Sequence, residues 1–189
     1  MNTPAHLVIG LAAFGRPGHT GLICAALVGA LIPDASLYLL CGWELFIVGT
    51  PPRVVFGQMY FSPEWQAIFA VDNSLVLWGA LCALGLALRR GWLVALSGAA
   101  LLHLIADFAL HNDDARRHFW PISDWVFASP FSYWDSDHHG GMIGGFEVAL
   151  VVALSIWMLT RFQGWWMRGL IIVLCAAEAA PFVIWRLVF

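Results

Sequence analysis

Three side chains in one apolar stretch have the types and the spacing that can hold a metal ion. His103, Asp107 and His111 follow one another at four-residue steps, so a helix places all three on one face. Neutral imidazole and carboxylate are ligands that suit zinc and similar divalent ions. Histidine and aspartate at this spacing also often hydrogen-bond to each other. The position of the three residues inside an apolar segment favours the metal site.

Further histidines follow in the strongly polar segment 111–145, which we call the outer loop. Its stretch WDSDHHGG contains His138 and His139, followed by two glycines that allow the backbone to approach a ligand closely. Adjacent side chains in extended backbone point apart, so we expect only one of the pair, His139, to join the same ion. The alternative is a hydrated loop without a ligand.

The outer loop also contains a run of charges, DDARR. For Asp113, Asp114, Arg116 and Arg117 we favour a solvated or salt-bridged segment. A second interpretation is that one arginine meets an anionic head group or phosphate, which the planar guanidinium fits.

Two more ionisable residues lie alone in apolar surroundings. His6 lies in the short apolar segment 4–14, and Asp34 follows Pro33 inside the longer run 21–49. An ionisable group at membrane depth is expensive and usually faces a bundle interior or a site. For His6 alone, an interfacial side chain is the favoured interpretation. For Asp34, a site residue and a helix-breaking Pro-Asp turn remain equal alternatives.

The elements that must position these residues are membrane helices. The chain of 189 residues is 61% hydrophobic and only 11% charged, whereas soluble domains carry about 25% charged residues. Its net charge of −3 and the absence of a basic stripe argue against nucleic-acid binding. We therefore expect an all-α, polytopic membrane helix bundle that forms one domain over 1–189.

The hydrophobic pattern predicts five to six membrane helices and one long polar loop, the outer loop. The first segment is too short for a full span, which needs about 20 residues. The predicted segments are 4–14, 21–49, 64–88, 92–110, 146–159 and 169–187.

Arginines in short loops mark the cytoplasmic side of a membrane. Arg89-Arg90 and Arg161 are separated by two predicted spans, so they fall on one side, and the outer loop then faces the periplasm of a bacterial inner membrane. With this topology nearly all the ionisable groups inside the predicted spans lie in the outer layer of the membrane. Ionisable residues without a shared role would instead be expected at scattered depths.

Two carboxylates near that layer are candidates for catalysis. Asp72 lies near the start of the span 64–88 and Glu147 in the first turn of the span 146–159. A bound metal ion lowers the pKa of a water molecule and polarises a phosphoryl or acyl oxygen. Either carboxylate, if it is not a ligand, can act as a general base.

Several short motifs resemble those of a known family. MNTPAHLVIG, LIPDASLYL and HLIADF, in this order, resemble the bacterial inner-membrane metal-dependent hydrolases of the YdjM-like group, which is distantly similar to zinc-dependent phospholipase C and P1-type nucleases. The resemblance covers most of 1–130 and implies ligand roles for His6, Asp34, His103 and Asp107. The run DDARRHFWP with a later WD-x-x-HHG is still more similar to small alphaproteobacterial membrane proteins that are sometimes labelled cobalamin-biosynthesis proteins.

One family motif is missing. The wider family carries a histidine-rich HRG-x-THS motif after the PD segment, where this chain reads AVDNSLVLW. Asp72 can supply an oxygen ligand at that place instead, and His138 or His139 the imidazole.

Two functions follow from these observations. The first is a membrane-embedded metal-dependent hydrolase, with a divalent ion, zinc in the first place, that acts at the periplasmic face on a phospholipid or another amphiphilic ester. The second is a non-catalytic membrane protein that binds a metal or ligand or serves as an accessory subunit of a complex. Glycine-rich helix faces permit close packing either within one chain or in a homo-oligomer.

Overall fold

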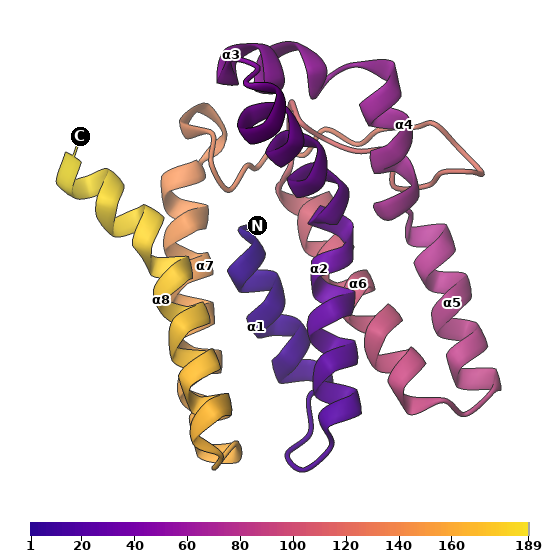
Figure 1. The fold of residues 1–189 in the computed structure, drawn as a ribbon, viewed down its shortest axis with the longest axis vertical. Coiled ribbons are helices and arrows are strands. Elements are labelled where there is room, and N and C mark those ends of the chain that lie inside the picture. The colour runs from indigo at the N-terminus through magenta and orange to yellow at the C-terminus, as the bar shows by residue number, and fades with distance from the viewer. Residues whose placement is uncertain (189) are drawn as a thin grey trace.

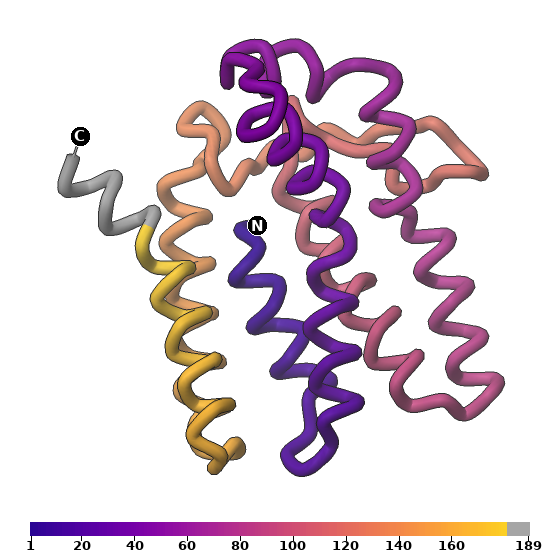
Figure 2. Tube along the Cα trace, in the orientation of Figure 1, coloured from indigo at the N-terminus to yellow at the C-terminus, as the bar shows by residue number. Residues whose placement is uncertain are grey.

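The computed structural model describes the backbone of residues 1–188 and the side chains of residues 1–180, and Figure 2 traces the chain. All regular elements in this part are helical, which confirms the predicted all-α fold. Two π-helical segments (Trp43–Val48 and Val55–Met59) and a short 3-10 helix (Ser136–His138) accompany the α-helices. The α-helices are α1 (Thr3–Phe14), α2 (Thr20–Gly42), α3 (Pro52–Val54), α4 (Pro63–Asp72), α5 (Leu75–Ala87), α6 (Gly91–Leu110), α7 (Gly140–Arg161) and α8 (Trp165–Val188).

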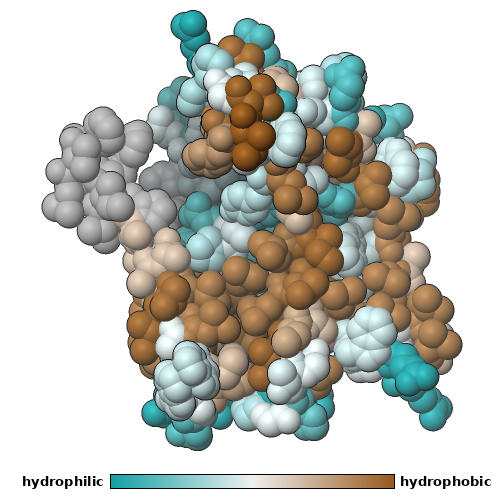
Figure 3. Space-filling view, viewed as in Figure 1, coloured by the Kyte–Doolittle hydropathy of each residue, from teal (hydrophilic) through white to brown (hydrophobic). Residues whose placement is uncertain are grey.

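Four helical segments among the described residues are long and apolar enough to cross a membrane. Apolar residues form a broad belt on the face seen in Figure 3, and hydrophilic residues gather at both ends of the molecule. These features indicate a helical membrane protein. The predicted number of five to six membrane helices also includes α1 and α8, and it stays a prediction. The four segments are Thr20–Val48, Pro63–Ala87, Gly91–Leu110 and Gly140–Arg161.

The short helix α1 lies in the middle of the bundle, in contact with α2, α6, α7 and α8 (Figure 1). Its first residues lie at mid-height, below a cap that α3, α4 and the outer loop form. The turns after α1, between α5 and α6, and between α7 and α8 all lie at the opposite end (Figure 1). These turns carry Arg16, Arg89-Arg90 and Arg161, so the predicted clustering of these arginine turns at one end is confirmed, whereas Arg53, Arg116 and Arg117 lie in the cap at the other end.

Glycines allow α2 and α6 to pack with their backbones in contact. A Cβ atom at Gly29 would lie 1.9 Å from the carbonyl oxygen of Leu96, so only glycine fits there. Likewise, a Cβ at Gly98 of α6 would lie 2.4 Å from the ring of Phe14 at the end of α1. Small residues at such crossings are typical of membrane helix pairs. They fix α1, α2 and α6, which carry the candidate ligands, close to one another.

One predicted helix is interrupted and one predicted boundary is wrong. The bounds predicted for the span 64–88 agree with the segment Pro63–Ala87, but its helix divides into α4 and α5, because Ser74 caps a new helix by accepting a hydrogen bond from the Leu77 N–H at 3.0 Å. Helix α7 begins at Gly140 and not at 146, so the outer loop ends at His139. Gly140 makes this start possible, since a Cβ there would lie 2.7 Å from the backbone of Asp135.

Candidate metal centre

His6, His103 and Asp107 form a compact buried cluster. One ligand atom from each lies within 4.8 Å of the other two, and the residues are 2%, 1% and 6% exposed. His6 Nε2 lies 3.0 Å from Asp107 Oδ1, and His103 Nε2 lies 3.0 Å from Asp107 Oδ2. Two imidazoles and a carboxylate at these distances are a suitable ligand set for a divalent metal ion.

Two helices supply this cluster. His103 and Asp107 lie one turn apart on α6, as their spacing predicts. His6 comes from the first turn of α1, which begins at mid-height in the bundle, and its ring stacks on that of His103 with centroids 3.5 Å apart. The predicted ligands His6, His103 and Asp107 are therefore brought together, although about a hundred residues separate the first from the other two.

The orientation of the His103 ring is set from α2. Its Nδ1 lies 2.7 Å from the carbonyl oxygen of Ala30, an acceptor only, so Nδ1 carries the proton and donates it. Nε2 then faces the carboxylates of Asp107 and of Asp34, the latter at 3.6 Å, without a hydrogen bond among the described residues. A metal-ligating histidine usually donates one ring N–H to a backbone carbonyl or carboxylate, and the bond from His103 to the Ala30 carbonyl fits this arrangement.

Asp34 and His111 flank the cluster. The Thr3 hydroxyl donates a hydrogen bond to Asp34 Oδ2, which holds that carboxylate beside His103. His111 lies 3.4 Å from Asp107 Oδ1 and 2.8 Å from Asp114 Oδ2. Burial lowers the pKa of His111, but the two carboxylates outweigh burial and raise this pKa to about 9. His111 is thus an imidazolium that bridges two carboxylates at the edge of the cluster.

The predicted ligand His139 does not reach the cluster. It is exposed, its backbone adopts a left-handed conformation (φ 67°), and its ring lies 5.7 Å from that of Phe131. Its place directly before α7 explains this outcome, because the left-handed residue turns the chain into the helix. Its neighbour His138 pairs with Asp135 at 2.6 Å within the outer loop.

The two predicted catalytic carboxylates also lie outside the cluster. Asp72 ends α4, and its side chain does not line the pocket described below, whereas the next residue, Asn73, does. Glu147 is buried on α7, where its Oε1 accepts a hydrogen bond from the Asn2 N–H at 2.5 Å. Because α7 begins earlier than predicted, Glu147 lies in its second turn and faces the start of α1, beside Glu178, which accepts from the Asn2 amide at 3.1 Å.

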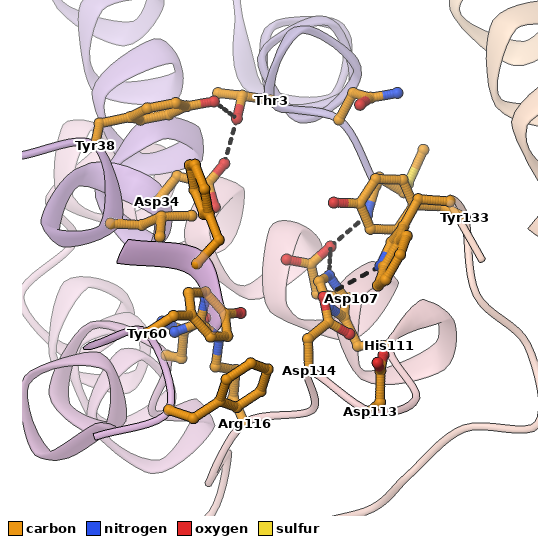
Figure 4. A pocket seen from close by; sticks show the side chains of 17 residues that line it. Thr3, Asp34, Tyr38, Tyr60, Asp107, His111, Asp113, Asp114, Arg116 and Tyr133 are labelled. Carbon is orange, nitrogen blue, oxygen red and sulfur yellow. Dashed lines mark hydrogen bonds and ion pairs between the residues drawn. The ribbon is translucent and has the colours of Figure 1, made fainter. Parts of the chain in front are cut away.

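A pocket of about 450 Å³ opens beside the cluster (Figure 4). Its wall includes Asp34, Asp107, His111, Asp114 and Arg116. His111 and Asp114 lie on one side, with Tyr60 and Arg116 across from them (Figure 4). An ion held by the cluster would therefore be accessible to a ligand in the pocket through Asp107 and Asp34.

For Asp114 and Arg116 the sequence favoured a solvated or salt-bridged segment, with an arginine that meets a phosphate as the second interpretation, and it did not place either residue at the pocket. Arg116 is 7% exposed and Asp114 is partly buried. The ion pair with His111 outweighs burial and lowers the pKa of Asp114, which keeps it ionised. The unusual density of charges directly after the His103–His111 stripe was the signal that could have located them.

Fold and site together define a helical bundle of the membrane-spanning kind with a buried histidine–aspartate cluster beside an open pocket. Comparison with protein-family models, with curated proteins and with solved structures finds no match. The resemblance to the YdjM-like hydrolases therefore stays a prediction.

Proposed function

We propose that the protein is a membrane-embedded metal-dependent hydrolase, with a zinc ion held by His6, His103 and Asp107. The observation that carries the proposal is the direction of the His103 ring. Its Nδ1–H donates to the Ala30 carbonyl, so its Nε2 points at the carboxylates of Asp34 and Asp107. An imidazole nitrogen that faces two carboxylates needs a cation between them, a proton or a metal ion, and a divalent ion serves both carboxylates at once.

The pocket residues fit hydrolysis. A bound zinc ion supplies an acidic water and polarises the oxygen of the bond to be broken. Asp34 lines the pocket, lies beside His103 and is oriented by Thr3, so it is placed to accept the proton of that water. Asp34 thereby takes the role of general base that the sequence suggested for Asp72 or Glu147.

The substrate we propose is a phospholipid or another amphiphilic ester at the periplasmic face of a bacterial inner membrane. Arginine turns gather at one end of the bundle, which by the positive-inside rule is cytoplasmic. The cluster lies in the opposite half, below the outer loop. Phe56, Phe61 and Trp134 also line the pocket and offer apolar surface to a lipid.

A second candidate is a non-catalytic membrane protein, and one observation favours it. Asp107 has His6, His103 and His111 within 3.4 Å, so protonated histidines alone can neutralise this carboxylate. In that case the cluster is a structural ion-pair network, or it binds a metal without catalysis.

The metal content of the purified protein is the first measurement that distinguishes these two functions. Purified protein is expected to contain about one zinc per chain by plasma mass spectrometry, and His103→Ala and Asp107→Asn should each lose it. His19→Ala is the matched control, since His19 is exposed at the arginine end. A wild-type protein without metal, even after reconstitution with zinc, refutes the hydrolase and leaves the ion-pair network.

Hydrolysis is tested on the metal-loaded protein with phospholipid and carboxylic-ester micelles. Asp34→Asn should keep zinc if Asp34 is the base, and lose about 10²- to 10⁴-fold in rate. Zinc binding without turnover of either ester supports the non-catalytic metal-binding protein.

A further inference from the structure

Arg116 is a buried cation without an anionic partner. It is 7% exposed, forms no ion pair among the described residues, and its Nη1 is buried without a hydrogen-bond partner. The other arginine of this run, Arg117, pairs with Asp124 at 3.2 Å and donates to the Gln66 carbonyl. Burying an unpaired charge is costly, so the isolation of Arg116 calls for a reason.

Aromatic rings hold the guanidinium of Arg116 in place. Its central carbon lies 4.1 Å from the ring centre of Phe69 and 5.0 Å from that of Tyr60. Burial, opposed by the charge of Arg116, raises the pKa of Tyr60 to about 12, so Tyr60 is a neutral ring and not an anionic partner. The backbone of Arg116 is fixed as well, because its carbonyl accepts a hydrogen bond from the Nδ1–H of His118 at 3.0 Å.

The pocket separates this cation from the metal cluster. Arg116 and Tyr60 form one wall, and Asp107, His111 and Asp114 lie across from them (Figure 4). No carboxylate of the pocket comes within ion-pair distance of the Arg116 guanidinium, so its donors remain available to a ligand.

We propose that Arg116 binds the phosphate group of the ligand, so that the pocket takes phosphate esters and not neutral carboxylic esters. A guanidinium presents donors in a planar fork that matches phosphate oxygens. A neutral ester offers no charge to offset the burial of Arg116. This inference rests on the proposed function in one respect: the zinc ion offsets the pocket carboxylates, which otherwise repel an anion.

The experiment is calorimetric titration of the protein, with and without zinc, against three probes. Inorganic phosphate and glycerol 3-phosphate represent soluble sources, and micelles of a short-chain phosphatidylglycerol represent a lipid head group. Arg116→Gln should bind the preferred probe about 10- to 100-fold more weakly, the loss typical of a charged hydrogen-bond partner, while its zinc content stays unchanged. Arg53→Gln, at an exposed arginine of the same end, should bind like the wild type.

Arg116→Lys keeps the charge and the aliphatic stem and tests the fork. We expect it to fold and to bind the probe several-fold more weakly than the wild type, because one ammonium cannot replace two parallel N–H donors. If Arg116→Gln does not fold, this variant decides alone, and an unchanged affinity overturns the inference.

The outcomes separate this inference from the proposed function. Equal phosphate affinity in wild type and Arg116→Gln, with zinc bound to both, overturns the role of Arg116 and leaves the metal site standing. A protein that binds no zinc but loses phosphate affinity in Arg116→Gln overturns the metal site and supports Arg116. Tighter binding of the lipid than of both soluble probes identifies a head group as the source, and the reverse order identifies a soluble phosphate.

Discussion

Gly29→Ala should loosen the candidate metal centre without touching any of its proposed ligands. Gly29 lies where α2 crosses α6, and an added Cβ would lie 1.9 Å from the Leu96 carbonyl oxygen and 2.7 Å from its carbonyl carbon. Both atoms belong to the backbone, so no side chain can rotate away. The adjacent carbonyl of Ala30 holds His103 at 2.7 Å. Forcing the helices apart at Gly29 therefore pulls on the group that orients His103.

The size of the effect follows from these distances. Relieving the contact to about 3.0 Å requires a shift of roughly 1.1 Å, which would stretch the His103–Ala30 hydrogen bond to about 3.8 Å and break it. Overpacking costs about 1–3 kcal/mol and the lost hydrogen bond about 1 kcal/mol. The better helix propensity of alanine returns about 1 kcal/mol. We expect a net destabilisation of about 1–3 kcal/mol and a 10- to 100-fold weaker zinc affinity.

Thermal unfolding in detergent and a zinc competition titration measure the two effects. Gly21→Ala is the control on the same helix, because a Cβ at Gly21 meets no atom within 4 Å. It should be as stable as the wild type or slightly more so, with the same zinc affinity. A Gly29→Ala protein that matches this control in both measurements would show that α2 and α6 do not pack through this glycine, and the account of His103 would fail.

Two further predictions concern substitutions of single residues. Burial, only partly opposed by the hydrogen bond to the Arg116 carbonyl, lowers the pKa of His118 to about 4, so the unfolded chain binds the extra proton between pH 6.5 and 4. The free energy of unfolding should fall by up to about 3 kcal/mol as the pH drops through this window. Thermal unfolding of His118→Asn, measured over the same pH range, should lack this loss of stability. An identical pH profile in the variant and the wild type would contradict the role of His118. His6→Ala should lose zinc by mass spectrometry, whereas His139→Ala and Asp72→Asn should retain it, and loss in either of these would place the site elsewhere.

Local spacing was enough to predict part of the site. His103 and Asp107 share a face because a helix repeats every 3.6 residues, and the structure keeps that helix unbroken from Gly91 to Leu110. The convergence of His6 and Asp34 on the same layer followed from counting spans and placing the arginine turns at one end. These inferences depend on helix geometry and membrane topology, both of which the hydrophobic pattern contains.

The residues that sequence reasoning misplaced depend on irregular backbone. His139 takes a left-handed conformation at the start of α7, and Asp72 lies before a helix break that the capping by Ser74 creates. A solvated or salt-bridged segment was favoured for Arg116 because no local pattern shows that Tyr60 and Phe69, some fifty residues earlier, fold over it. Such placements are decided by tertiary contacts, which periodicity does not describe.

The stacked histidines give a physical reason to prefer a metal ion over a network of protons. The rings of His6 and His103 lie face to face, 3.5 Å apart and within 9° of parallel, and both direct Nε2 at Asp107. Two stacked imidazolium rings would repel strongly in a buried site, so protons can charge at most one of the two rings. The His111 imidazolium and the Met1 ammonium, 3.4 and 2.7 Å from Asp107 Oδ1, already offset this carboxylate. A single divalent ion is attracted to both neutral rings and to Asp107 at once, so the stacked pair suits one shared cation that leaves neither ring charged.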